Sequence, residues 1–381
     1  MTAAVGPCGG EGVRVAHLTS VHPVHDTRIL YRECAALSAA GYDVTLVAPH
    51  DRDETVAGIR VKAVRRPKGR PDRLLHTTRD VYRAAVAEHA SVYHLHDPEL
   101  LPVGVALRRT GAAVVYDAHE DAPLQVLGKH WIPAPLRPLA AACVRATASA
   151  TYGSVDAFVA ATPSIAAGLP PDRTVVVQNF PVVEELATPD APALADREHL
   201  GVYVGGLSGG RGIREMVVAA GLVSEGLDFR LLLAGRWGRA GLESEIARVP
   251  GADRVEFLGW QSRSAIRRLL ARVRLGLVPL HPARNYLESY PIKLFEYMAA
   301  GLPVVASDFP LWRRIVEGAG CGLLIDPLDP SSIASAVTRL LDHPEEASAM
   351  GDRGRRAVMA RYRWDVEAEK LIALYARLAQ R

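Results

Sequence analysis

The sequence predicts an α/β protein with two domains, each doubly wound around a mainly parallel sheet. The chain has 381 residues, whereas one hydrophobic core rarely grows beyond about 250–300 residues. A cadence of strand, polar loop, helix, glycine and strand runs through the first half and begins again at residue 200. Such alternation favours parallel strands joined by crossover helices. We therefore expect two successive α/β domains that face each other across a cleft, the usual place for a ligand.

The first half shows this cadence from its start. Residues 13–19 form a short apolar run that predicts the first strand, and a polar loop follows at 20–28. Residues 29–40 have the apolar spacing of a helix and end at Gly41. Further strands are predicted at 43–48, 59–64, 91–95, 113–116, 156–161 and 175–178, and helices at 81–89 and 136–151. Ligands of parallel sheets bind beyond the carboxyl ends of the strands, so the polar residues after these strands are ligand-facing candidates.

The second half repeats the order. A strand at 200–204 is followed by a glycine-rich turn and a helix from Ile213. Further strands are predicted at 229–234, 255–258, 275–279, 302–306 and 321–325, and helices at 264–271, 331–341, 345–362 and 366–380.

Domain boundaries follow from these elements and from a stretch between them that is rich in proline, alanine and acids. That stretch predicts a linker at 184–199. We expect a disordered lead-in at 1–12, an N-terminal domain at 13–183 and a C-terminal domain at 200–362.

Composition and charge exclude several classes of protein. The chain is 49% apolar and 23% charged, as in ordinary soluble proteins, and its net charge of +3 does not indicate a nucleic-acid partner. Four scattered cysteines without a Cys-x-x-Cys pair are typical of a reducing cytoplasm. The N-terminus lacks the pattern of a signal peptide, and no apolar run of about 18 residues predicts a membrane span. A cytoplasmic protein is therefore expected.

One basic segment is rich in proline and glycine. It covers residues 65–73, with the sequence RRPKGRPDR. A solvated loop is the simplest interpretation, and the alternative is a contact with an acceptor or with an anionic membrane surface.

The glycine-rich turn covers residues 205–212, with the sequence GGLSGGRG. It lacks the Lys and the Ser or Thr of a phosphate-binding loop, and it is not G-x-G-x-x-G. An NTPase and a simple dinucleotide site are therefore disfavoured. What remains is a strand, a glycine turn and a helix beside Arg211, where the backbone can approach a diphosphate and the guanidinium can bind it. A flexible surface turn is the alternative.

A second stretch, residues 285–312, combines two acids with a helix N-terminus. Glu288 and Glu296 have seven residues between them, among which are Pro291 and Lys293. Pro291 suits the first turn of a helix whose free N–H groups can bind an anion. Glu296 can then reach a polar group attached to that anion, and a phosphate with a sugar hydroxyl is the simplest such ligand. Lys293 is either a second cation or a surface side chain, and Glu288 is either a ligand or an ordinary loop acid.

Several histidines invite a metal-binding interpretation. His94 and His96 alternate on one predicted strand and so point to one face, but neither has an obvious third ligand. No histidine has the H-E-x-x-H spacing of a zinc enzyme. We therefore expect no metal site.

Taken together, these residues resemble the retaining glycosyltransferases of family 4 (glycosyl transferases group 1). That family has the GT-B fold of two Rossmann-like domains, and the resemblance covers nearly the whole chain. Its strongest element is the pair Glu288 and Glu296, which continues into EYMAAGLPVVASD. Further matches are the Gly205-Gly206-Leu207 turn with Arg211, LLLAG at 231–235, VEFLG at 255–259, YRWDVEAEKLIALY near the end, and DTRI, YDVTLVAPH, HDPELLP and YDAHED in the first half.

The resemblance implies how the donor is bound. Arg211, assisted by Lys293, would hold the diphosphate at the turn of Gly205 and Gly206, and Glu296 would bind the ribose hydroxyls. The backbone near Gln261 would meet the nucleobase.

The resemblance also implies contacts to the transferred sugar. Glu288 would bind its hydroxyls, and His119 would face it near the anomeric carbon. Backbone groups would help at Ser289, Tyr290, Pro291 and Ile292. The last helix, within 363–381, would cross back to the N-terminal, acceptor-side domain.

The chain departs from the family pattern at two places. Gly206 stands where the family carries an arginine, and the first loop has VHDTR in place of a Gly-Gly pair. His25, Asp26 and Arg28 are therefore candidate first-loop contacts. Arg28 is a candidate replacement for the missing charge, which predicts that Arg28→Ala weakens donor binding.

The expected activity is transfer of a sugar from a UDP-, GDP- or dTDP-linked donor to an unidentified acceptor hydroxyl. It would proceed with retention of configuration and without a metal or other cofactor. The alternatives are an epimerase or hydrolase on the same fold and a non-catalytic subunit that binds a nucleotide sugar. An NAD-dependent dehydrogenase is disfavoured, because no G-x-G-x-x-G follows either first strand.

Overall fold

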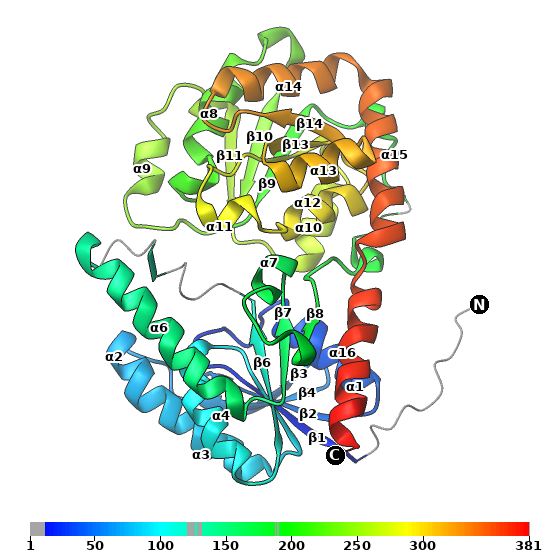
Figure 1. Cartoon of the computed structure of the whole chain (residues 1–381). Coiled ribbons are helices and arrows are strands. Elements are labelled where there is room, and N and C mark those ends of the chain that lie inside the picture. Colours follow the sequence, from blue (N-terminus) through cyan, green and yellow to red (C-terminus); the bar gives the residue numbers. More distant parts are fainter. Residues whose placement is uncertain (1–11, 120–125, 128–131, 187, 189, 381) are drawn as a thin grey trace. The chain divides into compact units, whose positions relative to one another are not determined.

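The computed structural model describes residues 12–119, 126–127, 132–186, 188 and 190–380 (Figure 1). Except for Gly12, the predicted lead-in lies outside the described residues. The chain divides into two compact units. Unit 1 contains Met1–Asn179 and Asp365–Arg381, and unit 2 contains Phe180–Trp364.

Unit 1 is built on an eight-stranded sheet in the order β3-β4-β2-β1-β5-β6-β7-β8. Its neighbouring strands are parallel, except that β3 pairs antiparallel with β4 at the edge, a strand that the sequence did not indicate. The strands are β1 (Arg14–Leu18), β2 (Asp43–Pro49), β3 (Glu54–Val56), β4 (Ile59–Val64), β5 (Val92–Leu95), β6 (Ala113–Ala118), β7 (Ala157–Ala160) and β8 (Thr174–Val176). The apolar runs of the inner strands are typical of a sheet covered on both faces.

Helices connect the strands of unit 1. The helix predicted at 29–40 consists of a π-helical segment, η1 (Ile29–Cys34), and α1 (Ala35–Ala39). The other helices are α2 (Arg70–Asp72), η2 (Arg73–Thr77), α3 (Thr78–Glu88), α4 (Leu101–Arg108), α6 (Arg137–Thr151), α7 (Pro163–Ala166) and α16 (Trp364–Ala379). Within the described residues, no helix has both the length and the apolar composition needed to cross a bilayer.

The basic segment 65–73 lies on the surface of unit 1. Arg65 faces the carboxylates of Asp72 and Asp80, and Arg66 pairs with Asp51. Such exposed ion pairs are what a solvated, charge-balanced loop makes. A contact of this segment with an acceptor or a membrane stays a prediction.

The strand order of unit 1 changes direction at β1, which lies between β2 and β5. His17 of β1 is in register with His94 of β5. A doubly wound sheet opens a crevice at such a switch point, beyond the carboxyl ends of the strands. His96 and Asp97 follow β5 and His119 follows β6, so these side chains lie at the same edge of the sheet.

Unit 2 is built on six parallel strands in the order β11-β10-β9-β12-β13-β14. The strands are β9 (Leu200–Val204), β10 (Arg230–Ala234), β11 (Val255–Gly259), β12 (Leu275–Val278), β13 (Val304–Ser307) and β14 (Gly322–Ile325). The helices are α8 (Ile213–Leu222), α9 (Leu242–Ile246), α10 (Arg263–Leu270), α11 (Arg284–Leu287), α12 (Ile292–Ala299), α13 (Pro310–Ala319), α14 (Pro330–Asp342) and α15 (Pro344–Arg361). The order changes direction at β9, so the glycine-rich turn begins at the switch point of this sheet.

The stretch predicted as a linker is part of unit 2. Leu186 and Leu194 are buried in its hydrophobic core. Phe180 packs against the rings of Tyr290 and Phe295. Because these side chains belong to the second core, the division of the chain falls before Phe180 rather than after residue 183.

Candidate functional site

A backbone cradle forms in unit 2 where β9 ends. Gly205 has a φ of +141°, and a Cβ atom there would lie 2.6 Å from Lys293 Nζ and 3.3 Å from an Arg211 guanidinium nitrogen. A Cβ atom on Gly206 would lie 3.4 Å from the same guanidinium. The two glycines therefore bring two cations directly against the backbone.

Lys293 lies on the first turn of α12. Its Nζ atom is buried, although the residue as a whole is partly exposed, and no hydrogen-bond partner exists for it among the described residues. The Nζ atom lies 3.6 Å from the centroid of the Tyr203 ring. Burial, and after it the charge of Arg211, hold the pKa of Lys293 well below its usual value. Lys293 is therefore not a surface side chain, and the charge of Glu296 acts on it more weakly than burial and Arg211 do.

Arg211 ends the short 3-10 turn that precedes α8. Its guanidinium faces the hydroxyl groups of Tyr203 and Tyr286, which orient it without neutralising it. Two neighbouring cations repel each other at low dielectric unless an anion joins them. The cradle is therefore suited to an anionic ligand, and a diphosphate carries charge enough for both cations.

Glu296 lies one turn after Lys293 on α12 and is 6% exposed. Arg263 at the start of α10 donates a hydrogen bond to Glu296 Oε1 and another, 2.9 Å long, to Glu185 Oε2. Sequence reasoning missed Arg263. No signal in the sequence links it to Glu296, because the two side chains meet only after α10 and α12 pack in unit 2.

The loop between α11 and α12 carries further predicted contacts. Glu288 is exposed at the end of α11. Ser289 accepts a hydrogen bond at its carbonyl oxygen from Trp312 Nε1 at 2.8 Å, which holds the loop in place. Pro291 precedes the first helical residue, Ile292, whose N–H has no acceptor within the helix.

Two other predicted contacts have different surroundings. The Tyr290 ring packs against core aromatic rings, so this residue can reach a ligand through its backbone. Gln261 follows β11 and donates from Nε2 to Leu258 O at 2.6 Å. The neighbouring Trp260 is 64% exposed, and a nucleobase contact here stays a prediction.

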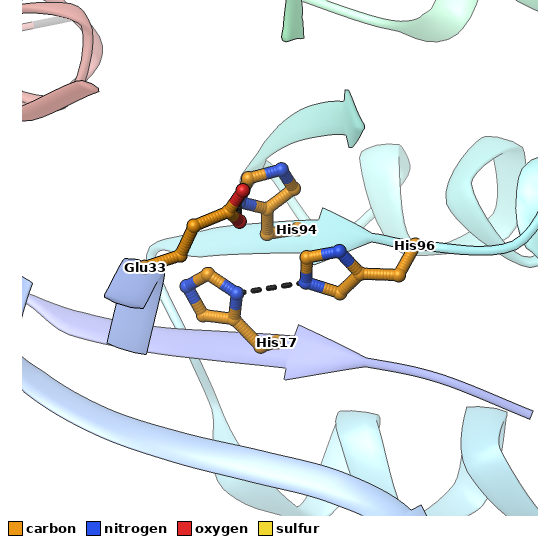
Figure 2. Close-up of side chains that lie close together, drawn as sticks. All are labelled: His17, Glu33, His94 and His96. Atoms are coloured by element: carbon orange, nitrogen blue, oxygen red, sulfur yellow. Dashed lines mark hydrogen bonds and ion pairs between the residues drawn. The ribbon is translucent and has the colours of Figure 1, made fainter. Parts of the chain in front are cut away.

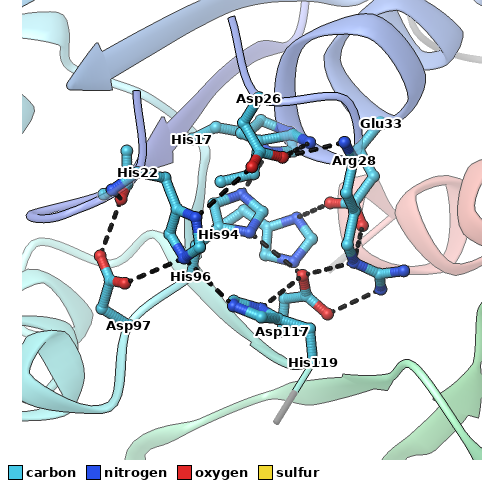
Figure 3. Close-up of polar contacts among 12 residues, drawn as sticks. His17, His22, Asp26, Arg28, Glu33, His94, His96, Asp97, Asp117 and His119 are labelled. Atoms are coloured by element: carbon cyan, nitrogen blue, oxygen red, sulfur yellow. Dashed lines mark hydrogen bonds and ion pairs between the residues drawn. The ribbon is translucent and has the colours of Figure 1, made fainter. Parts of the chain in front are cut away.

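His119 belongs to unit 1, at the edge of a polar network beyond β1, β5 and β6 (Figure 3). Its Nδ1 atom lies 3.3 Å from Asp117 Oδ2, and its Nε2 atom lies 3.2 Å from Nε2 of His22. His22 Nδ1 lies 3.5 Å from Asp26 Oδ2, and His22 Nε2 lies 3.4 Å from Asp97 Oδ1. The imidazole of His119 is thus oriented by a carboxylate on one side and by a second imidazole on the other.

Asp117 is the centre of this network. It accepts hydrogen bonds from Arg28 Nε at 2.9 Å and from Arg28 Nη2 at 2.8 Å, and His96 Nδ1 lies 3.1 Å from its Oδ2 atom. Arg28 also donates to Val177 O at 3.0 Å and lies 3.0 Å from Glu33 Oε1. Because its donors are used inside unit 1, Arg28 has a structural role, and this geometry argues against its replacing the missing charge at the diphosphate.

The other first-loop candidates differ in exposure. His25 is exposed and accessible to a ligand. Asp26 accepts hydrogen bonds from the backbone N–H groups of Arg28 and Ile29 at 2.9 and 3.0 Å. Burial opposes ionisation, but the hydrogen bonds from His22 and from these N–H groups together lower the pKa of Asp26 to about 2. Asp26 therefore shapes the loop as an ionised cap.

Comparisons with solved structures agree with this architecture. The fold is similar to that of sucrose-phosphate synthase from Thermosynechococcus elongatus, with a TM-score of 0.77 and 22% identity over 96% of this chain and 99% of that one. It is also similar to Anabaena HepE, solved in complex with UDP and glucose, with a TM-score of 0.72 and 14% identity over 96% and 100% of the two chains. The two parallel-sheet units define a GT-B fold.

Sequence comparisons give the family. Residues 27–179 match the glycosyl transferase 4-like domain, and residues 187–357 match the glycosyl transferases group 1 domain. The chain belongs to the group 1 glycosyltransferases, family 4, of the GT-B fold.

Curated relatives match part of the chain. It is 29% identical to the MMP α-(1→4)-mannosyltransferase of Mycolicibacterium hassiacum over 36% of this chain and 33% of that protein. It is 28% identical to the α-D-kanosaminyltransferase of Streptomyces kanamyceticus over 46% of this chain and 44% of that protein. The alignments thus span less than half the length of these relatives.

Proposed function

We propose that the protein is an enzyme that transfers a sugar from a nucleotide-diphosphate sugar to an acceptor hydroxyl, with retention of configuration at the anomeric carbon. Family membership supports a glycosyl transfer, and the mannosyltransferase and kanosaminyltransferase relatives act in that way by name. Structures of Anabaena HepE with UDP-glucose support a nucleotide-sugar donor. We keep UDP-, GDP- and dTDP-linked sugars as the candidate donors.

The cation pair in unit 2 carries the proposal. Lys293 Nζ is buried without a hydrogen-bond partner among the described residues, and Arg211 lies beside it at the turn of Gly205. A buried ammonium group without a partner costs free energy, which an anionic ligand would recover. The N-terminus of α12 adds N–H groups that favour the same charge.

Each predicted residue has a role in this proposal. Glu296, held by Arg263, binds the ribose hydroxyls. Glu288 binds hydroxyls of the transferred sugar. His119 stabilises positive charge near the anomeric carbon, or positions the sugar there, with Asp117 behind it.

The chemical step is a substitution at the anomeric carbon. The acceptor oxygen forms the new bond to this carbon on the face from which the diphosphate leaves, and the bond to the phosphate oxygen breaks with its electron pair on that oxygen. The acceptor proton goes to the leaving-group oxygen, so no separate base is required. Arg211 and Lys293 stabilise the charge that grows on the diphosphate, and we assign this role to them rather than to a divalent ion.

A panel of nucleotide sugars tests the proposal. One donor should raise the melting temperature of the protein strongly, because ligand that binds only the folded state stabilises it. Lys293→Ala and Arg211→Ala should abolish this shift, whereas Arg214→Ala, an exposed arginine on the first turn of α8, should preserve it. Equal shifts in all three variants would refute the assignment of the cradle.

Turnover assays separate the alternatives. An epimerase or hydrolase would consume the donor without an acceptor, and a non-catalytic subunit would release no nucleotide even with acceptor mixtures. A transferase releases nucleotide only when an acceptor is present, and the anomeric configuration of the product, read by NMR, tests retention. Turnover that requires added Mg²⁺ or Mn²⁺ would contradict the metal-independent step. A cytoplasmic location stays a prediction.

A further inference from the structure

Four potential metal ligands meet in the core of unit 1, outside the proposed donor cradle. His17 comes from β1, His94 and His96 come from β5 or directly follow it, and Glu33 comes from η1 (Figure 2). The register of the sheet places His17 opposite His94. One ligand atom from each of the four residues lies within 4.8 Å of the other three. The third and fourth ligands that the sequence did not show are therefore His17 and Glu33.

These four side chains are fully or almost fully buried. His17 Nε2, His94 Nε2 and Glu33 Oε2 have no hydrogen-bond partner among the described residues. Buried polar groups are almost always paired, because an unpaired one loses its hydrogen bonds to water without replacing them. Each of these three residues therefore keeps a buried polar atom whose partner is not among the described residues.

The hydrogen bonds of the cluster indicate which ring nitrogens carry a lone pair. Asp117 accepts from His96 Nδ1 at 3.1 Å, so His96 Nε2 carries a lone pair. His17 Nδ1 faces that lone pair at 2.9 Å, so both facing nitrogens present lone pairs to an ion when the proton of His17 lies on Nε2.

The buried carboxylates beside this cluster outnumber the cations that contact them. Arg28 lies against two buried carboxylates, Asp117 and Glu33, and can balance one of them. Either a proton or a second cation must therefore accompany the other carboxylate in the folded protein.

We propose that His17, Glu33, His94 and His96 bind one transition-metal ion, with Zn²⁺ as the expected occupant. Three imidazole nitrogens and one carboxylate oxygen are a ligand set that zinc accepts. In a tetrahedral site with bonds of about 2.0–2.1 Å, ligand atoms lie about 3.3 Å apart. His17 Nδ1 and His96 Nε2 lie 2.9 Å apart, and no two of the four ligand atoms are more than 4.8 Å apart, so small side-chain shifts bring them to this spacing.

The surroundings resemble a second coordination shell. A metal-bound histidine usually gives its other N–H to a carboxylate, and His96 does so to Asp117. Tyr375 of α16 lies 2.8 Å from His94 Nδ1 and ties the C-terminal helix to the cluster. Because Asp117 also contacts His119, the ion would fix the position of His119 through one intervening carboxylate.

Such an ion is structural. All four of its positions are taken by protein, so it offers no open site to a substrate. The proposal is therefore independent of the metal-free transfer step, and the two can fail separately.

Metal analysis of the full chain tests this inference. The protein is produced without a histidine tag, denatured with a chelator, refolded with Zn²⁺ and passed through a desalting column. We expect about one zinc per chain. Refolding with Co²⁺ should give the visible absorption of a four-coordinate site with nitrogen and oxygen ligands. Less than about a tenth of an equivalent of zinc, together with a Co²⁺ spectrum of the hydrated ion, overturns the proposal.

Variants identify the ligands. Glu33→Gln removes the charge at nearly constant volume and should weaken zinc binding by at least about 100-fold, and Asp117→Asn should weaken it by about 10–100-fold. His76→Gln replaces an exposed histidine of the same unit and should retain zinc. Unchanged zinc in a folded Glu33→Gln protein would place the ion elsewhere and refute the site. If the variants do not fold, the stoichiometry and the Co²⁺ spectrum of the wild type still decide the question.

Discussion

The guanidinium of Arg263 joins two carboxylates, Glu296 on α12 and Glu185 near the start of unit 2. Glu296 is 6% exposed, whereas the side chain of Glu185 is 43% exposed. An ion pair with one partner buried fixes that partner's position, while the exposed partner contributes little. Arg263 therefore orients the carboxylate that we assign to the ribose.

The first prediction concerns this ion pair. Arg263→Ala should weaken binding of the nucleotide-sugar donor by about tenfold, or ~1.4 kcal/mol, because Glu296 loses its fixed position. Glu296→Ala should weaken it further and cripple turnover while the fold remains intact. Isothermal titration calorimetry measures the affinities, and circular dichroism checks the fold. Glu185→Ala is the matched control and should stay within about twofold of wild type. Equal losses in the Glu185 and Arg263 variants would contradict the positioning role.

The second prediction concerns the glycine turn. Gly205→Ala would introduce a Cβ atom 2.6 Å from Lys293 Nζ at a backbone φ of +141°. The variant should therefore lose donor binding, since the lysine must move away from the cradle. Gly209→Ala, in the same turn, meets nothing within 4 Å and should bind as wild type does. Thermal shift with the identified donor distinguishes the two, and normal binding by Gly205→Ala would exclude the cradle.

The third prediction concerns pH. Burial, and then Arg211, lower the pKa of Lys293 in the free protein, and a bound diphosphate should raise it again. The protonated lysine binds the anion better, so affinity is greatest below the pKa of the free protein. It falls by up to about tenfold per pH unit as pH rises between the free and bound pKa values. A nucleotide sugar is the suitable ligand, because its diphosphate does not titrate near neutrality.

Proton uptake on binding measures this effect. Calorimetry in buffers with different ionisation enthalpies should detect it in the wild type. Lys293→Arg carries a permanent charge and should bind without proton uptake. A donor affinity that does not change with pH in the wild type would show that Lys293 does not meet the diphosphate.

The fourth prediction concerns the buried ion pairs of unit 1. Arg28→Ala would leave Asp117 and Glu33 buried without their cation, so it should lower the free energy of unfolding by about 3–5 kcal/mol. Arg60→Ala breaks an exposed pair with Asp43 and should cost about 0–1 kcal/mol. Urea denaturation measures both. A change in Arg28→Ala as small as that in Arg60→Ala, accompanied by weaker donor binding, would restore the hypothesis that Arg28 binds the diphosphate.

Much of the fold could be predicted because its signals are local. The apolar run at 200–204 is β9 in the structure, and the run at 59–64 is β4. The sequence did not predict the short edge strand Glu54–Val56, because its stability comes from pairing with β4 and not from its own composition. The stretch predicted as a linker belongs to unit 2. The sequence did not show this, because burial of Leu186 and Leu194 depends on a core formed by distant residues.

In the candidate site, too, local patterns indicated some residues, and contacts between distant segments decided others. Arg211 and Lys293 were identified from the residue types around a glycine turn and a helix start, where backbone geometry and charge are set within a few residues. Arg263 was missed, and the role expected for Arg28 was not supported. Their partners come from segments far away in the chain, and side-chain pairing across such distances leaves no local pattern.

The sequence by itself determined the α/β class, the two sheet-based halves, the family resemblance and the position of the glycine turn of unit 2, because periodicity, glycines and prolines act over short ranges. Only the tertiary structure decided that Lys293 Nζ is buried without a partner, that Arg263 holds Glu296, and that His17 and Glu33 join His94 and His96. Burial and ion pairing depend on which distant segments share a low-dielectric interior, and strand register and helix packing set that arrangement.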